Sequence, residues 1–427
     1  NPVAGAAQDV PTLPSPGDPI TSGVQLRACF APWQTGWRMK QIEADWLAHA
    51  DTQCVFDMLI AAGHQAFAVG GCVRNTILGV PVSDIDIATS ATPDETTHLA
   101  KASRIKAIPT GFDHGTVTLV VNSTPFEVTT FRRDIETDGR RAVVAFTKDI
   151  GEDARRRDFT MNALYADANG VLHDPIGGMQ DLLARRVRFI ENADERIKED
   201  NLRSLRFFRF HAQYGDPSEG LDPDALAAIA SNVDGLSDLA GERIGAEMVK
   251  LLATPDPAPS LAGMSATGAL AAILPGSNPQ WIAPLVHLES ECGQRPDAMR
   301  RLAALGGDDP VKRWRLSRSD AKKRSQLVEI GMGMTPIAEV AWRYGEDIAW
   351  SAILIRQALS EQPIPETTAE TIENAVAAEF PLKAKDLMEY VAGPALGAAL
   401  KRAETAWIES DFELSRTALM DVALKEG

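Results

Sequence analysis

Apolar residues recur at helical spacing near the start of the chain and at alternating spacing soon afterwards. The stretch 41–62 is periodically apolar and ends at Gly63, which predicts a helix. A second, shorter helix is expected from Val73 to Leu78, closed by Gly79. Runs of alternating or β-branched residues predict strands at 66–69, 83–88, 116–121 and 126–131.

Beyond about residue 195 the pattern becomes helical, rich in Ala and Leu, and is interrupted by Gly- and Pro-containing breaks. This change predicts an α+β fold, in which a small mixed sheet with helices is followed by an all-α region. The expected domains are an extension at 1–38, a head at 39–170, a neck at 171–260, and a helical body and tail at 261–427.

Three segments carry weaker patterns. Residues 1–37 are rich in Pro and Gly and lack the layout of a signal peptide, so we expect a disordered extension. The segment 132–148 is charged and has few apolar anchors, which predicts mobility. Residues 158–165 look helical.

Two acidic residues, Asp84 and Asp86, flank a single residue within one predicted strand. Side chains alternate along a strand, so both carboxylates should project from the same face. Such a pair is costly unless a cation lies between them, and Mg²⁺ prefers carboxylate and phosphate oxygens. Glu127, on a later strand, could complete the cluster. Taken alone, the acids could equally mark a solvent-facing strand.

The segment just upstream favours the chemical interpretation. Gly70 and Gly71 stand where a strand runs into a helix, and Arg74 follows within the first turn. Glycines let backbone N–H groups approach a phosphate, a helix N-terminus favours an anion, and arginine adds a charge-assisted contact.

Residues 69–89, which contain these glycines, Arg74 and both aspartates, resemble the first signature of the class II tRNA nucleotidyltransferase and bacterial poly(A) polymerase family. The resemblance implies a polymerase-β-like nucleotidyltransferase head. It implies that Asp84 and Asp86 bind Mg²⁺ and that Gly70, Gly71 and Arg74 contact the nucleotide. Asn75 stands where the family usually has aspartate. Asparagine keeps a polar, hydrogen-bonding side chain at this position but drops the charge.

Two further stretches resemble signatures of the same family. Residues 127–132 resemble the strand with the third carboxylate, Glu127. Residues 156–163 resemble the second signature, which is associated with ribose and phosphate recognition, although an isolated run of this kind could be a solvated face. The nucleotide-binding residues implied here are Arg156, Arg157, Asp158 and Asn162.

Residues 199–209 read as a helix in which Asp200, Arg203 and Arg206 recur every three residues along one side. An intrahelical salt bridge would account for this spacing. The segment also resembles the family's templating helix, which makes Asp200 and Arg203 the expected base readers. By the same resemblance, Arg206 and Arg209 face the nucleotide.

A carboxylate beside a guanidinium suits cytosine and adenine. Both bases present an amino donor next to an unprotonated ring nitrogen, whereas guanine and uracil present a carbonyl next to an N–H. The wrong bases would leave buried polar groups unpaired, and sites built this way reject analogues strongly.

Composition changes this picture in two ways. The formal net charge of −16 argues mildly against a uniformly basic nucleic-acid surface, so local patches matter. A basic stretch lies at 299–324 and is a candidate surface for the tRNA backbone, although a solvated helix face is also possible. Its members are Arg300, Arg301, Lys312, Arg313, Arg315, Arg318, Lys322, Lys323 and Arg324.

The remaining indications concern the setting of the protein. No apolar run is long enough to span a membrane. The four cysteines are far apart and have no metal-ligand spacing, so a reducing, cytoplasmic setting is the simplest interpretation.

The resemblance implies an Mg²⁺-dependent enzyme that adds C, C and A to the 3′ end of tRNA from CTP and ATP. Poly(A) polymerase, and a partial enzyme that adds only CC or only A, stay open because they share the same template. A non-catalytic tRNA-binding protein of the same fold is a third alternative.

Overall fold

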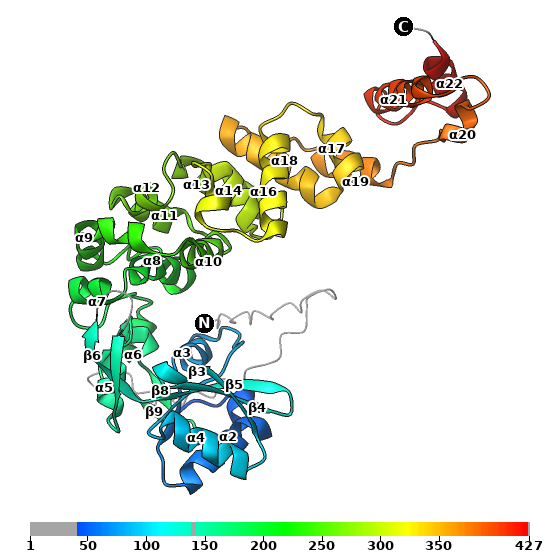
Figure 1. Ribbon diagram of the computed structural model, residues 1–427. Coiled ribbons are helices and arrows are strands. Elements are labelled where there is room, and N and C mark those ends of the chain that lie inside the picture. The colour runs from blue at the N-terminus through cyan, green and yellow to red at the C-terminus, as the bar shows by residue number, and fades with distance from the viewer. Residues whose placement is uncertain (1–40, 138–141, 426–427) are drawn as a thin grey trace, which may run out of the picture. The chain divides into compact units, whose positions relative to one another are not determined.

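A computed structural model describes residues 41–137 and 142–425, which form two compact units (Figure 1). The sheet unit contains residues 41–131 and 164–174, and the helical unit contains the remaining described residues. The segment 132–163 therefore belongs with the helical unit, although the expected head included it. The extension predicted at 1–38 lies outside the described residues.

The sheet unit is built on one mixed sheet in the order β3-β4-β5-β2-β1-β8-β9. Of its described strand pairs, β2 with β5 is parallel and the others are antiparallel. The strands are β1 (Ala66–Val69), β2 (Asp86–Thr89), β3 (Lys106–Gly111), β4 (Thr116–Val121), β5 (Thr124–Thr130), β8 (Tyr165–Ala166) and β9 (Leu172–His173). The helices are α1 (Asp45–Ala48), α2 (Ala50–Ala61), α3 (Gly71–Leu78), α4 (Pro93–Ala102) and the 3-10 turn η1 (Phe112–His114).

Alternation along the strands separates a core face from a more open face. In β5, Phe126 and Val128 are buried, whereas Glu127 between them is exposed. Helices α2 and α4 pack against each other, α2 against β1, and α4 against β3, β4 and β5 (Figure 1). The buried face of the sheet therefore lies against these helices, and Glu127 lies on the other face.

The structure corrects several predicted boundaries in the sheet unit. The helix expected over 41–62 is interrupted at His49, which has an extended backbone. His49 Nδ1 accepts a hydrogen bond from the Asp51 amide and so caps the start of α2. The predicted strand 83–88 begins only at Asp86, the first residue that pairs with β5, and its other neighbour β1 ends at Val69. Asp84 therefore lies ahead of β2. The helix expected over 158–165, which runs along the chain from the helical unit into the sheet unit, is a 3-10 turn followed by β8.

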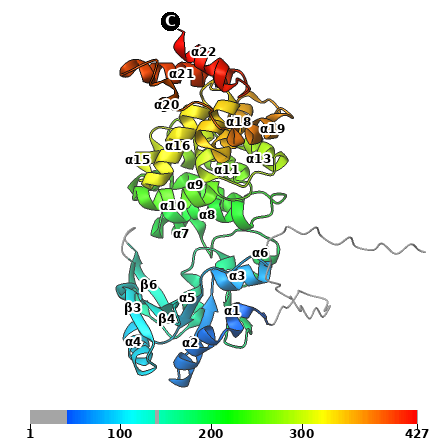
Figure 2. The ribbon, with the colours of Figure 1, turned by 90° about the vertical axis from the view of Figure 1, so that its right-hand side faces the viewer.

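The helical unit begins with a two-stranded hairpin and continues as helices (Figure 2). The hairpin pairs β6 (Arg132–Thr137) with β7 (Ala142–Phe146) within the segment predicted to be mobile. Residues 138–141 of this segment lie outside the described residues, so its mobility stays a prediction.

Among the described helices, five pairs pack most extensively: α8 with α10, α14 with α16, α17 with α18, α17 with α19, and α21 with α22. In the described chain no helix is long and apolar enough to cross a membrane. The helices up to α12 are α5 (Ile150–Arg155), η2 (Thr160–Asn162), α6 (Gly178–Leu183), α7 (Ala193–Glu199), α8 (Leu202–Tyr214), α9 (Pro223–Ser231), η3 (Val233–Asp238), α10 (Gly241–Leu252), α11 (Ala258–Ala266) and α12 (Ala269–Ile273). The later ones are η4 (Pro279–Trp281), α13 (Ile282–Glu291), α14 (Ala298–Leu305), α15 (Pro310–Arg313), α16 (Arg318–Gly331), α17 (Ile337–Tyr344), α18 (Glu346–Ser360), α19 (Thr368–Ala377), α20 (Ala384–Leu387), α21 (Pro394–Glu409) and α22 (Arg416–Leu424).

A buried ion triad joins α13 to α14. Glu289 accepts hydrogen bonds from Arg300 Nη1 at 2.9 Å and from Arg301 Nη2 at 2.7 Å. Arg301 is 1% exposed and also donates to the carbonyl oxygen of Leu252 at 2.8 Å, at the end of α10. The expectation that Arg300 and Arg301 belong to a tRNA-binding surface is therefore wrong, because both side chains are used inside the fold.

Removing the acid of this triad should be costly. Glu289→Gln leaves two buried guanidinium groups without a counter-charge, and breaking a buried pair in this way costs about 3–5 kcal/mol in the free energy of unfolding. Urea unfolding followed by circular dichroism measures the loss. Glu242→Gln, which breaks the exposed pair with Arg315, is the control. Equal urea midpoints for the two variants would contradict the structural role.

Candidate active site

The glycine pair forms the turn from β1 into α3. Gly70 has φ 72° and ψ −119°, a conformation that residues with a Cβ rarely adopt, and it precedes the first helical residue, Gly71. A Cβ at Gly71 would lie 3.8 Å from Arg74 Nη2, so the Arg74 guanidinium lies over the first turn of the helix. The structure thus brings Gly70, Gly71 and Arg74 together at a helix N-terminus, where an anion is favoured.

Asn75 links this arginine to the segment that leads to Asp84. Its Oδ1 accepts from Arg74 Nε at 3.1 Å and from Nη2 at 2.9 Å, while its Nδ2 donates to the Pro81 carbonyl oxygen at 2.8 Å. An aspartate could accept from the arginine but could not donate to the carbonyl when ionised. Asparagine at this position therefore makes a contact that the family's usual acid would not make.

Two of the three predicted carboxylates are register partners. Asp86 pairs with Glu127 across the parallel strands β2 and β5, and the next pair, Ile87 with Val128, is buried. Because alternate side chains share a face, Asp86 and Glu127 project together from the more open face. Asp84 precedes the strand and is exposed, and its Oδ2 accepts from Ser83 Oγ at 2.8 Å.

These carboxylates suit a hard divalent cation that takes only part of its ligands from the protein. Among the described residues no group of three or more His, Cys, Asp or Glu side chains is arranged to hold a metal ion. Carboxylate oxygens are nevertheless the protein ligands that Mg²⁺ prefers, and Mg²⁺ usually fills its other positions with water and phosphate oxygens. The residues that fit this role are Asp84 and Asp86, with Glu127 beside Asp86.

Cys72 lies beneath the carboxylates but does not belong to the chemistry. Its Sγ is 3.4 Å from the Val69 carbonyl oxygen and 3.9 Å from that of Asp86. Burial, reinforced by the charge of Asp86, raises the pKa of the thiol to about 11. Cys72 is therefore a neutral packing residue.

In the helical unit, Asp158 joins the loop after α5 to α8. Its Oδ1 accepts from the Phe159 amide and from Asn162 Nδ2, both at 2.9 Å. Its Oδ2 accepts from Arg206 Nε at 2.8 Å and from Nη2 at 2.6 Å. Burial acts to raise the pKa of this carboxyl, but the charge of Arg206 and these hydrogen bonds outweigh it and lower the pKa to about 2.

Asp153 is a residue that the sequence interpretation missed. It is 1% exposed and pairs with Arg156 Nε at 2.9 Å and with Arg157 Nη2 at 3.0 Å. The two arginines follow Asp153 by three and four residues, which is the spacing of neighbours on a helix. This spacing in the sequence could have predicted the two ion pairs of Asp153.

Glu247 on α10 was also missed, and no local signal could have indicated it. Its carboxylate lies 2.6 Å from Arg209 Nε and 3.8 Å from Arg206 Nη1. Arg206 and Arg209 are therefore both engaged in ion pairs between α8 and its neighbours.

The expected templating helix is interrupted. Asp200 has extended backbone angles, φ −153° and ψ 104°, and it separates α7 from α8. Its Oδ1 accepts from the Leu202 amide at 3.1 Å, so the side chain begins the new helix. The prediction of one continuous helix over 199–209 is therefore wrong. Arg203 lies in the first turn of α8, pairs with Glu199, and donates to the carbonyl oxygen of Arg156 at 3.2 Å.

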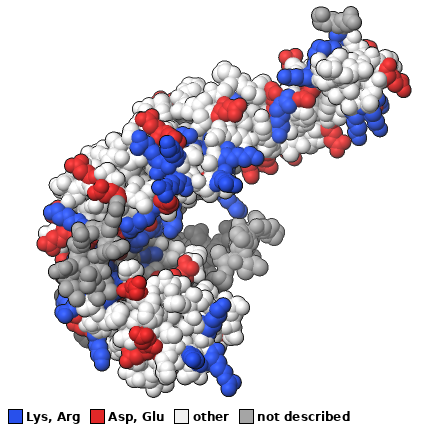
Figure 3. Space-filling model, in the orientation of Figure 1, with Lys and Arg blue, Asp and Glu red and all other residues white. Residues whose placement is uncertain are grey.

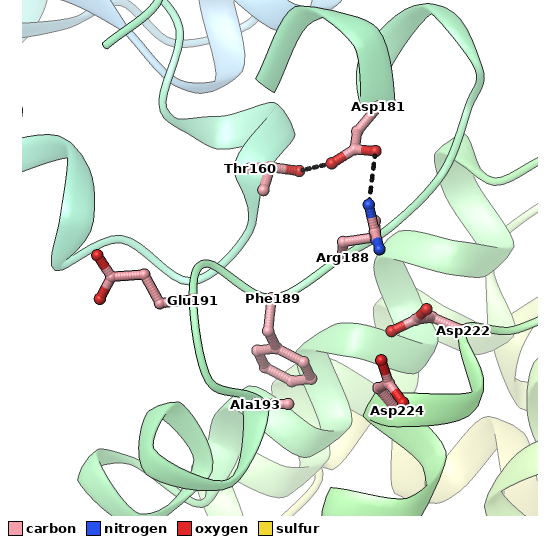
Figure 4. Close-up of a pocket in the computed structure, with 8 residues that line it drawn as sticks. All are labelled: Thr160, Asp181, Arg188, Phe189, Glu191, Ala193, Asp222 and Asp224. Carbon is pink, nitrogen blue, oxygen red and sulfur yellow. Dashed lines mark hydrogen bonds and ion pairs between the residues drawn. The ribbon is translucent and has the colours of Figure 1, made fainter. Parts of the chain in front are cut away.

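A pocket in the helical unit does not match the predicted chemistry (Figure 4). Thr160 donates to Asp181 at 2.8 Å, and Arg188 lies 3.7 Å from the same carboxylate. Most charged side chains in the lining are acidic, which disfavours a phosphate. The lining residues are Thr160, Asp181, Arg188, Phe189, Glu191, Ala193, Asp222 and Asp224.

Basic side chains gather over the part of the helical unit that carries α14 to α16 (Figure 3). The predicted basic set no longer includes Arg300 and Arg301. Of its other members, Arg315 pairs with Glu242 and Lys323 pairs with Asp297. The exposed members of the set are Lys312, Arg313, Arg315, Arg318 and Lys322.

Comparison with known proteins shows which family the chain resembles. A family model described as the poly(A) polymerase head domain matches residues 66–188, and one described as the probable RNA- and SrmB-binding site of polymerase A matches residues 220–280. The CCA-adding enzyme of Streptococcus sanguinis strain SK36 is 32% identical over 375 residues, covering 83% of this chain and 92% of that protein. The chain belongs to the CCA-adding enzyme family.

Other members of the CCA-adding enzyme family match this chain over different fractions of their length. Human mitochondrial CCA tRNA nucleotidyltransferase 1 is 42% identical over 197 residues, which is 46% of this chain and 45% of that protein. Several curated relatives are matched over about half of their length. A crystal structure of the Bacillus stearothermophilus CCA-adding enzyme in complex with CTP superimposes with a TM-score of 0.68 at 27% identity, covering 88% of this chain and 96% of that one. Enzymes of this family generally use divalent metal ions.

The low pKa of Asp158 makes a prediction about stability. The folded pKa of about 2 lies below the ordinary value of 3.8, so the ionised carboxylate stabilises the folded protein above about pH 4 and loses this effect as the pH falls toward 2. Asp158→Asn should lower the free energy of unfolding at neutral pH by about 2 kcal/mol. Urea titrations should show the difference from wild type shrinking below about pH 4. A difference that stays constant into acid would contradict the ion pair, and Asp94→Asn, at an exposed site, is the control.

Proposed function

We propose that this chain adds C, C and A to the 3′ end of tRNA, using CTP and ATP and releasing pyrophosphate. The observation that carries the proposal is the pairing of Asp86 with Glu127 on the open face of the sheet, beside a glycine turn with Arg74. Family membership and the solved CTP complex of a relative support the choice of substrates. The predicted cytoplasmic setting is part of the proposal, and the described cysteines are free thiols.

The sheet unit would supply the transfer chemistry. Asp84 and Asp86 would hold Mg²⁺, which when bound lowers the cost of negative charge on the attacking and leaving oxygens. Glu127 would add a third carboxylate beside Asp86. The backbone at Gly70 and Gly71 and the guanidinium of Arg74 would orient the triphosphate so that the RNA 3′-hydroxyl meets the α-phosphorus in line with the departing pyrophosphate.

The helical unit would supply nucleotide recognition. Asp200 would accept from the amino group of cytosine or adenine, and Arg203 would donate to the ring nitrogen. The further nucleotide-recognition residues proposed are Arg156, Arg157, Asp158, Asn162, Arg206 and Arg209. Like Arg203, which pairs with Glu199, each of them is also engaged in contacts inside the unit. The exposed basic residues of α15 and α16 are the proposed tRNA-backbone surface.

The carboxylates predict a clear loss of activity. Asp86→Ala should lower nucleotide incorporation by about three orders of magnitude, the scale seen when a preorganised group that stabilises the transition state is removed. The fold should persist, because the change relieves a like-charge contact. Radiolabelled CTP incorporation measures the loss, with Asp94→Ala as control. Near-normal incorporation by the Asp86→Ala variant would remove the catalytic assignment.

The number of nucleotides added separates the proposal from its alternatives. Wild-type protein, incubated with tRNA lacking its CCA and with CTP and ATP, should add three nucleotides and stop, as sequencing of the product ends will show. Long adenylate tails would favour a poly(A) polymerase, in keeping with the name of the head-domain model. Addition of only CC or only A would indicate a partial enzyme, and no addition would indicate a binding protein.

A further inference from the structure

Asp200 lies in the break between α7 and α8, so its backbone is not part of either helix. Its Oδ1 is held by the Leu202 amide at 3.1 Å. Its Oδ2 is held by Arg243 Nη2 at 2.8 Å, from a position on α10 that is 43 residues away in the sequence. The carboxylate is thus anchored at both oxygens, and its plane is set by two different elements.

Other residues of the segment 232–243 also make contacts at or near the break between α7 and α8. A Cβ at Gly235, in η3, would lie 2.5 Å from the side-chain amide of Asn201, so only glycine leaves room for Asn201 there. Asn232 Nδ2 donates to Asp194 on α7 at 2.7 Å. Residues 232–243 therefore line the break with three contacts, of which only the Arg243 contact reaches the carboxylate.

The Asp200–Arg243 pair is open to solvent. The side chains of Arg243 and Asp200 are 47% and 31% exposed, so the carboxylate has room for a further partner. An exposed ion pair of this kind contributes little to stability. A carboxylate oxygen can accept more than one hydrogen bond, so Asp200 can keep both anchors while accepting from an amino group.

We propose that Arg243 is a positioning residue for nucleotide selection, which holds the Asp200 carboxylate in the one orientation that accepts from a base amino group. The inference rests on the proposed role of Asp200 as a base reader. With Oδ1 and Oδ2 both anchored, the carboxylate cannot turn away from a base that presents a carbonyl, and uracil or guanine then faces an acceptor. Without Arg243 the carboxylate can rotate about its Cβ–Cγ bond, so rejection of the wrong base weakens.

The experiment compares wild type, Arg243→Ala, Arg243→Lys, Asp200→Ala and the double variant Asp200→Ala/Arg243→Ala as full-length proteins. Equilibrium dialysis measures the affinities for CTP and UTP, and incorporation into tRNA lacking CCA gives kcat and KM for each. Arg243→Ala should lower the preference for CTP over UTP about tenfold. Arg243→Lys should restore part of the preference, and the thermal melting temperature should not change.

In the Asp200→Ala background, removing Arg243 should have no further effect, because its action passes through that carboxylate. Glu242→Gln, the neighbouring position on α10, is the matched control and should keep the wild-type preference. If Arg243→Ala keeps the preference while Asp200→Ala loses it, the inference is overturned and the proposed function stands. The inference would also be overturned if Arg243→Ala reduced the preference for CTP over UTP by the same factor in the Asp200→Ala background as in the wild-type background. If the wild-type protein does not distinguish CTP from UTP, both fall.

Discussion

The parallel register of β2 and β5 is the constraint on which the candidate chemistry depends. It sets Asp86 beside Glu127 on the open face while Ile87 and Val128 fill the core below them. A slip of one residue would turn Glu127 into the core and Val128 outward, so burial of the apolar residues fixes the position of the acids. As an order of magnitude, two unit negative charges placed about 4 Å apart repel by about 1 kcal/mol in water and by about 4 kcal/mol near a protein surface, and a cation between them would turn this repulsion into attraction.

In the helical unit, charge is used mainly to join elements. Asp158 with Arg206 and Glu247 with Arg209 connect segments that are distant in the sequence, while Glu289 with Arg301 joins the successive helices α13 and α14. Arginines that look like phosphate ligands in the sequence are thus engaged in ion pairs inside the helical unit. The exposed basic residues on and between α15 and α16 are the surface proposed for an RNA backbone, and such a local patch is compatible with a net charge of −16.

Local pattern was sufficient for much of the sheet unit. The strand at 116–121 was predicted with its observed bounds, and the glycine turn and Arg74 lie together as the motif indicated. Long-range contacts account for most of the failures. The carbonyl oxygen of Leu252, at the end of α10 and 49 residues before Arg301, is a partner that no local pattern indicates.

The break at Asp200 shows a different limit. Helical spacing of Asp200, Arg203 and Arg206 suggested one helix, but the Asp200 side chain instead caps the Leu202 amide and turns toward Arg243. Aspartate side chains readily accept hydrogen bonds from the free backbone amides at helix starts. The residue at which the helix begins then depends on packing against α10. The charged segment 132–148 gave no strand signal either, yet its backbone pairs as β6 and β7.

The central claim, that paired carboxylates on the open face bind a divalent cation for nucleotidyl transfer, can be measured without turnover. Electron paramagnetic resonance reports free Mn²⁺ as the full-length protein is titrated in the presence of a non-hydrolysable CTP analogue. The account predicts that wild-type protein removes Mn²⁺ from solution, that Asp86→Asn largely abolishes this binding, and that Glu127→Gln weakens it. Unchanged Mn²⁺ affinity in Asp86→Asn would contradict the account, because the cation would then be held elsewhere.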